Sequence, residues 1–165
     1  MVVRHILAGA ALVLGLAACS GGEGATASTQ TPAPAQSAVH PVSGLKVIDL
    51  VVESGGRKIP LKVELADTPE AQARGLMFRT ELGDNEGMIF PSATPEPRSF
   101  WMKNTPLSLD IIFIGVDGRI MNIAANTTPY SLDSVKSDGI ASGVLELRAG
   151  RAKALGIVPG DKVTY

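Results

Sequence analysis

The stretch KVIDLVVESGGRKIPLKVEL (Lys46–Leu65) decides the fold class of this chain. Its first part is rich in β-branched residues, and its last part alternates apolar and polar residues from Pro60 onward. This alternation, interrupted by Ser54-Gly55-Gly56-Arg57, predicts two antiparallel strands joined by a tight turn. Pro60 has no amide proton to donate, which indicates a sheet edge or a bulge at that position.

Downstream of this hairpin the chain continues as short apolar segments separated by glycine and proline. The expected further strands cover residues 88–90, 99–103, 109–114, 119–124 and 144–147, and residues 158–165 are expected to form a turn and a last strand. A short helix is expected from Pro69 to Leu76, because Thr68 can cap it and proline suits the first helical position. A second helical turn is expected at residues 150–155, stopped by Gly156. The sequence therefore predicts a mostly β fold, a small compact barrel or sandwich with one or two short helices.

The N-terminus has the features of a bacterial lipoprotein signal. Arg4 and His5 precede an apolar run from Ile6 to Leu16, and Ala17-Ala18-Cys19 follows it. A charged start, an apolar run of this length and small residues at the cut indicate a secretory signal over residues 1–18. Cys19 is then the lipidated residue, which places the protein in the bacterial envelope, facing the periplasm. The alternative is a buried N-terminal helix with an incidental cysteine.

Two further regions complete the predicted organisation. Residues 19–44 are rich in glycine, alanine, serine, threonine and proline, and this composition predicts a disordered tether. Residues 45–165 have the length of a single compact domain. Ser20, directly after the lipidated cysteine, favours the outer over the inner membrane, since an aspartate there favours inner-membrane retention in enterobacterial lipoproteins.

Composition excludes several classes of function. The chain has 15 basic and 16 acidic residues, a balance that argues against nucleic acid as a partner. With His5 and His40 placed outside the expected domain and Cys19 acylated, no histidine or thiol remains for a Ser-His-Asp or Cys-His site or for a zinc site. Glycine-rich phosphate loops are absent, so we expect neither a cofactor nor a metal.

Polar residues next to the single tryptophan form the candidate site. Asp110 and Glu146 each lie between apolar residues of an expected strand, where alternation favours side chains that point to solvent. The alternative is a concave polar site with an aromatic wall, suited to a small polar ligand such as a sugar. Lys103 and Asp110 could equally form a structural ion pair. The candidate ligand-binding residues are Arg74, Trp101, Lys103, Asn104, Asp110 and Glu146.

Several blocks of the domain resemble the domain-of-unknown-function family 192. They are Arg74-Gly75-Leu76-Met77-Phe78-Arg79, Gly87-Met88-Ile89-Phe90, Phe100-Trp101-Met102-Lys103-Asn104-Thr105, Leu109-Asp110-Ile111-Ile112-Phe113-Ile114 and Val144-Leu145-Glu146-Leu147. The resemblance implies a compact, mostly β fold and carries over no catalytic role. This chain departs from the family at Ser92, where an aromatic residue commonly follows the proline, and at Gly143.

Two functions from different classes follow. The first, which we favour, is a non-catalytic envelope module that binds a small polar ligand, a glycan or another envelope protein, with the membrane contacted through the acyl chains on Cys19. The second is a carboxylate-dependent hydrolase or lyase acting on envelope glycans, with Asp110 and Glu146 as its acids. That chemistry requires the two carboxylates to face each other across one cleft.

Overall fold

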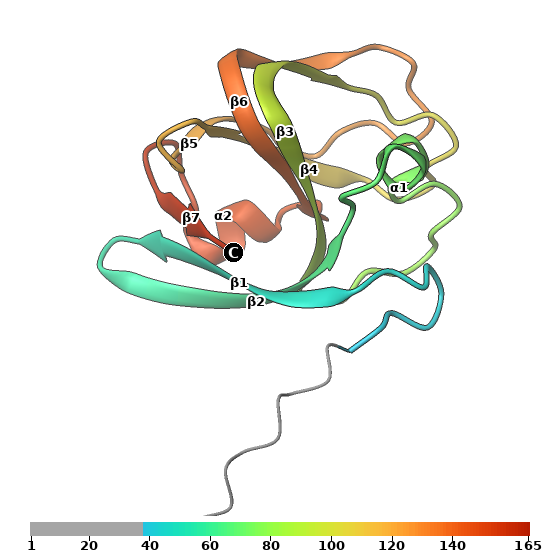
Figure 1. Cartoon of the computed structure of the whole chain (residues 1–165), viewed down its shortest axis with the longest axis horizontal. Helices are drawn as coiled ribbons and strands as arrows, with labels where there is room; N and C mark the ends of the chain where they lie inside the picture. The colour runs from blue at the N-terminus through green and yellow to red at the C-terminus, as the bar shows by residue number, and fades with distance from the viewer. Residues whose placement is uncertain (1–37) are drawn as a thin grey trace, which may run out of the picture. The chain divides into compact units, whose positions relative to one another are not determined.

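A computed structural model describes residues 38–165, which form a curled half-barrel sheet with two short helices (Figure 1). This confirms the predicted mostly β fold. The predicted signal of residues 1–18, the lipidated Cys19 and the tether as far as residue 37 lie outside the described residues. The strands are β1 Val47–Ser54, β2 Arg57–Leu65, β3 Glu86–Phe100, β4 Leu109–Gly115, β5 Ile120–Ala124, β6 Val135–Arg148 and β7 Lys162–Thr164; the helices are α1 Pro69–Arg74 and α2 Arg151–Leu155. None of the helices described is long and apolar enough to cross a membrane.

The predicted hairpin of β1 and β2 is confirmed. Ser54 pairs with Arg57, and the two loop residues Gly55 and Gly56 both have positive φ, 54° and 76°. Two residues with positive φ make the turn whose twist matches that of the flanking strands, and glycine adopts this conformation without steric strain. Pro60 pairs with Val51 of β1, whereas β2 pairs with β3 only from Lys62 onward. The proline therefore lies in a section of β2 that has a neighbouring strand on one side only.

Strand β3 is longer than the sequence predicts. It continues past Pro91 to Phe100, so the expected break after Phe90 is wrong, and residues 101–103 lie outside the strand. The long strand β6 pairs with it, and the register shifts between Pro91 and Glu96 and again between Pro97 and Ser99. Prolines remove ladder hydrogen bonds, and the bulged register accommodates them without ending the strand.

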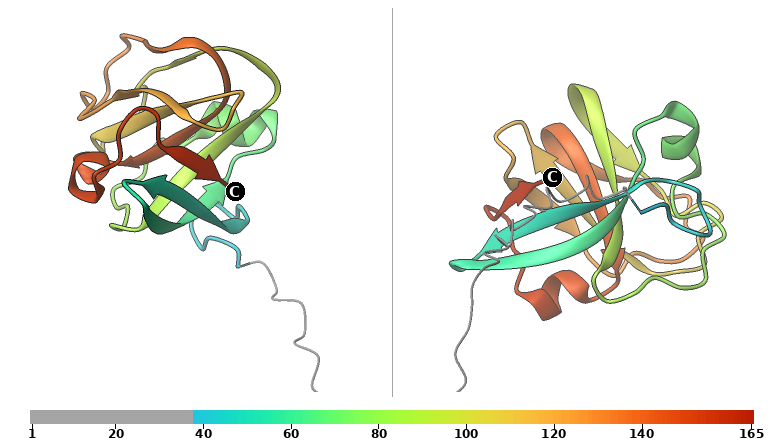
Figure 2. Two further views of the ribbon diagram at one scale, coloured as in Figure 1. Left: turned by 90° about the vertical axis from the view of Figure 1, so that its left-hand side faces the viewer. Right: turned by 60° about the horizontal axis from the view of Figure 1, so that its bottom comes forward.

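The sheet has the order β5-β4-β6-β3-β2-β1-β7, and each of its faces carries its own apolar core. The concave inner face buries residues of all seven strands together with Ala152 of α2. The convex outer face is covered by α1 and by the loops that follow β2 and β3 (Figures 1 and 2). The two edges of the sheet meet through a bridge between Arg119 and Lys162. The outer-face core consists of Ala66, Leu76, Leu82, Met88, Phe90, Met102, Leu109, Ile111, Phe113 and Val144.

Candidate functional site

The register of β4 and β6 separates the two predicted carboxylates. Ile111 pairs with Glu146 and Asp110 pairs with Leu147. Residues opposite each other in an antiparallel pair share a face, and neighbours along a strand point to opposite faces. Glu146 therefore points to the outer face and Asp110 to the inner face, so these two carboxylates cannot act together on one substrate.

Asp110 is a structural residue. Its side chain is fully buried, and its Oδ2 accepts a hydrogen bond from the amide of Ala152 at 2.9 Å. Its Oδ1 accepts from the amides of Asn126 at 2.9 Å and Gly150 at 3.1 Å. These amides lie at the start of α2 and in the loop after β5, where amides left without strand partners need an acceptor. Both predictions for Asp110, exposure to solvent and membership of the ligand site, are wrong.

Glu146 is a buried acid of the outer face, so the expectation that it points to solvent is wrong. Its residue is 4% exposed, and its neighbours across the sheet are Met88 on β3 and Ile111 on β4. Burial in these apolar surroundings raises the pKa of its carboxyl group from 4.5 to about 8. Among residues 38–165 no hydrogen bond or ion pair to this carboxyl group is formed. At neutral pH Glu146 is therefore mostly protonated and retains a free donor and acceptor.

Glu146 borders a cavity of about 260 Å³ between α1 and the end of β3. The cavity brings together four of the predicted site residues: Arg74, Trp101, Lys103 and Glu146. Asn104 lies beside it, where its backbone oxygen accepts from the Phe78 amide at 2.8 Å and its side-chain amide contacts the Met77 sulfur. The other lining residues are Gln72, Ala73, Gly75, Leu76, Met77, Phe90, Arg98, Ser99, Phe100 and Thr105.

Three cations border this cavity, each beside an aromatic ring. The Lys103 ammonium lies 5.2 Å from the centre of the Trp101 ring, and the Arg98 guanidinium lies 5.5 Å from that of Phe100. The Arg74 guanidinium lies 5.9 Å from the Phe78 ring. In the part of the chain that the structure describes, Arg74 and Lys103 form no ion pair, in contrast to most of the other arginines. The predicted ion pair between Lys103 and Asp110 is wrong, because Asp110 points to the other face.

Arg98 is the lining residue that the sequence analysis missed. Its guanidinium donates to the Ser92 hydroxyl at 2.9 Å and to the Gln72 side-chain oxygen at 3.3 Å. Glu96 is its nearest carboxylate, at 3.9 Å and largely exposed. The departure from the family at Ser92 thus supplies an anchor for this arginine. Arg98 was missed because it follows Pro95 and Pro97, and two prolines so close together are typical of a loop rather than a strand.

The loop that carries Trp101, Lys103 and Asn104 is held by its neighbours. The Met102 amide donates to the Ser131 oxygen at 2.9 Å, and the Tyr130 amide donates to the Thr105 oxygen at 3.1 Å. Phe78 and Tyr130 have positive φ, 64° and 60°, which is unfavourable for aromatic residues. Backbone strain of this kind persists where the surrounding structure enforces it, and it concentrates at functional sites.

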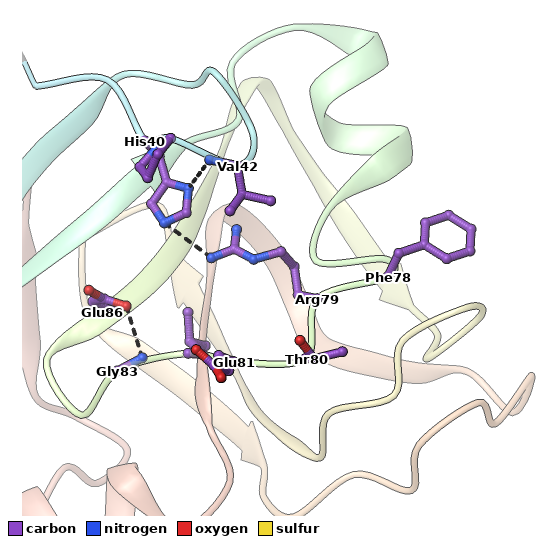
Figure 3. Close-up of a pocket in the computed structure, with 10 residues that line it drawn as sticks. His40, Val42, Phe78, Arg79, Thr80, Glu81, Gly83 and Glu86 are labelled. Atoms are coloured by element: carbon purple, nitrogen blue, oxygen red, sulfur yellow. Dashed lines mark hydrogen bonds between the residues drawn. The ribbon is translucent and has the colours of Figure 1, made fainter.

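A second cavity, of about 530 Å³, lies on the same face beside Arg79 (Figure 3). The Arg79 guanidinium points toward the ring of His40, 3.2 Å from Nε2, and its Nη1 donates to Oε1 of the buried Glu64 at 2.7 Å. The Ser43 hydroxyl donates to the other Glu64 oxygen. The prediction that His40 lies outside the domain is wrong, because the bridge between Val39 and Lys46 folds this segment back onto the sheet.

Two acids beside this second cavity have partners within the fold. Glu64 has an arginine and a hydroxyl as partners, and Glu86 accepts from the Gly83 amide at 2.9 Å. No group of three or more His, Cys, Asp or Glu side chains within residues 38–165 is arranged to hold a metal ion. The cavity beside Glu146 is therefore the better candidate for ligand binding, since the side chains of Glu146, Arg74 and Lys103 form no hydrogen bond or ion pair within residues 38–165.

Comparison with known proteins places this chain in a family. Residues 50–165 match DUF192, described as "Uncharacterized ACR", and the chain belongs to this family. No curated protein matches it.

Two solved structures are similar to the chain. A protein of unknown function from Novosphingobium aromaticivorans DSM 12444 is 51% identical, with a TM-score of 0.77 over 80% of this chain and 94% of that one. A protein from Sinorhizobium meliloti 1021, described with a proposed role as a transcription regulator, is 38% identical, with a TM-score of 0.71 over 73% of this chain and 94% of that one. These structures support the fold and leave the biochemical activity open.

Proposed function

We propose that this DUF192 protein is a lipid-anchored binding protein of the bacterial envelope, and that its domain holds a small polar ligand in the cavity beside Glu146 without changing it chemically. The anchor rests on the sequence around Cys19, with its basic start, apolar run and small residues. Acylation on this cysteine holds the domain at the membrane surface, facing the periplasm, with the outer membrane favoured by Ser20.

The observation that carries the binding role is the carboxyl group of Glu146. This carboxyl group forms no hydrogen bond within residues 38–165, so its donor and acceptor are free to bond to a ligand. It borders a cavity that also presents an exposed tryptophan and three cations. A concave site with an apolar wall and a few convergent polar groups is the usual form of a small-molecule site.

Two other activities fit less well. A glycan hydrolase or lyase acting through Asp110 and Glu146 lacks its acid pair, because the two carboxylates lie on opposite faces of the sheet. A role in transcription, as described for the Sinorhizobium meliloti relative, would favour a basic surface, and this chain has 15 basic against 16 acidic residues.

Trp101 reports directly on the proposed site, because it is the only tryptophan of the chain and it is 49% exposed. We expect its fluorescence to change saturably when the full-length protein is titrated with monosaccharides or muropeptides. The detergent that keeps the acylated protein in solution must carry no sugar headgroup. A Glu146→Leu variant should lose the response without a fall in its melting temperature. A flat titration with every one of these ligands would refute the binding role.

The anchor is tested separately by substituting Cys19→Ser. We expect the unmodified protein to sediment with membranes and to incorporate a palmitate analogue in growing cells, and the variant to do neither. Membrane association that survives this substitution would contradict lipidation at Cys19 and leave the ligand site untouched.

A further inference from the structure

We propose that the ligand of the Glu146 cavity is an acidic saccharide, a single sugar ring with an attached carboxylate. The carboxylate binds Arg74, Arg98 and Lys103, the ring lies against Trp101, and the Glu146 carboxyl group donates a hydrogen bond to a ligand oxygen. This inference rests on the proposed function and adds the chemical class of the ligand.

The charges at the cavity require an anion. Two of its cations, Arg74 and Lys103, form no ion pair within residues 38–165, and the third has only an exposed carboxylate 3.9 Å away. Glu146 is the one acidic residue of the lining, and burial keeps it neutral below pH 8. The cavity therefore carries uncompensated positive charge at neutral pH. Arginine presents paired donors that match the geometry of a carboxylate, so a carboxylate is a suitable counter-ion.

The shape and the aromatic wall favour a sugar ring. The cavity volume of about 260 Å³ lies just below the roughly 300–1,000 Å³ typical of sites for drug-sized molecules, so it suits one ring rather than a long chain. Trp101 is half exposed beside this cavity, and Phe90 and Phe100 line it farther in. An exposed indole with a wet edge offers a flat apolar surface to a ring that is itself polar at its rim.

Glu146 couples binding to protonation. Its protonated form donates to the ligand; its ionised form can no longer donate and adds a negative charge beside the anion. The charged groups around it are Arg74 of α1, Arg98 of β3 and Lys103 of the following loop. On β4 its neighbour is the apolar Ile111. Affinity for an acidic sugar should therefore fall as the pH rises through about 8.

The test compares N-acetylmuramic acid with N-acetylglucosamine, which share a ring and differ in one ether-linked carboxylate. We expect the full-length protein to bind the acidic sugar about tenfold more tightly at pH 6 by calorimetry. Lys103→Gln and Arg74→Gln should each reduce this preference. Lys153→Gln, which removes an exposed cation on α2, is the matched control and should change nothing.

The pH dependence gives an independent readout. Affinity for N-acetylmuramic acid should fall about tenfold between pH 7 and 9 in the unmodified protein and stay level in Glu146→Gln. Equal binding of both sugars would overturn the acidic-saccharide inference and leave the proposed function standing. Lactate bound as tightly as the acidic sugar would overturn it as well, since the ring would then contribute nothing. Absence of binding by every sugar would overturn both proposals.

Discussion

Glu64 and Glu146 lie on the same face of the sheet, in one row across three strands, with Met88 between them. Both are buried, at 3% and 4% exposure. Glu64 pairs with Arg79 and accepts a hydrogen bond from Ser43. Glu146, two strands away, has apolar neighbours across the sheet and a cavity in front of it. Burial raises the pKa of the Glu146 carboxyl group from 4.5 to about 8.

This comparison distinguishes Glu64, whose ion pair belongs to the folded core, from Glu146, which is proposed to bind a ligand. A buried charge is tolerated when a partner of opposite charge and further hydrogen bonds compensate for its lost hydration, as they do for Glu64. Glu146 receives no such compensation and remains neutral instead. A strongly perturbed acid in a cleft is a candidate functional group, and the fold here gives it no structural use.

The largest expected change in the free energy of unfolding comes from removing the ion-pair partner of Glu64, so that this acid, like Glu146, is buried without a partner. The substitution Arg79→Met removes the partner of Glu64 and leaves an acid buried without compensation. We expect the free energy of unfolding at pH 7 to fall by about 3–5 kcal/mol, because removing one member of a buried pair leaves the other charge stranded. Urea denaturation at pH 7 measures it.

Lys62→Met is the control for this substitution. Lys62 also forms an ion pair, with Asp49, but both side chains are mostly exposed. Such a surface pair contributes at most about 1 kcal/mol. If Arg79→Met were as mild as Lys62→Met, the ion pair of Glu64 would not be the reason that this acid is tolerated in the core.

The second largest effect is the change in the free energy of unfolding when either acid is replaced by glutamine, and its sign should differ between Glu146 and Glu64. The pKa of Glu146 is raised from 4.5 to about 8, so the folded protein holds its proton over a range where the unfolded chain releases it. The contribution of Glu146 to the free energy of unfolding is largest below pH 4.5, falls as the pH rises toward 8, and is constant above pH 8. Glu146→Gln removes this loss, and it should stabilise the protein by about 3 kcal/mol at pH 7 and hardly at all at pH 4.

The same substitution at Glu64 is its matched control. Glu64→Gln weakens the pair with Arg79 and strands a buried guanidinium, so it should destabilise the protein at pH 7. Thermal melting of both variants across pH 4–9 distinguishes them. A Glu146→Gln variant that is less stable than the unmodified protein at pH 7 would mean that the carboxyl group has a structural partner, and the contrast between the two acids would fail.

Much of this fold follows from local patterns in the sequence. The Gly55-Gly56 turn and the Thr68 cap depend on residues close together in the chain, and both are observed where they were predicted. The length of β3 was not predictable, since its second half is held by pairing with β6, about 40 residues away along the chain. Long-range pairing overrides the local signal of three prolines.

The site was predictable only in part for the same reason. Arg74, Trp101, Lys103 and Glu146 meet at one cavity, as the sequence analysis proposed. The position of Asp110 was predicted wrongly because alternation shows only that neighbouring residues point to opposite faces of a strand. It does not show which parts of the chain cover each face. His40 and Glu64 were overlooked because their environment depends on residues 38–46 folding back over the outer face, which is a tertiary contact.

The smallest expected effect concerns this N-terminal segment, residues 38–46, which covers Glu64 and has no counterpart over Glu146. Its Ser43 hydroxyl donates to Glu64 and accepts from the Leu45 amide at 3.1 Å. Ser43→Ala should lower the free energy of unfolding by about 1 kcal/mol, the usual contribution of one such hydrogen bond. The amides of His40 and Val47, which bond to Leu45 and Ala38, should exchange hydrogen faster, whereas the exposed Ser134→Ala should change neither quantity. Unchanged exchange in Ser43→Ala would show that Arg79 alone shields Glu64, and that the covering segment plays no part in distinguishing the two acids.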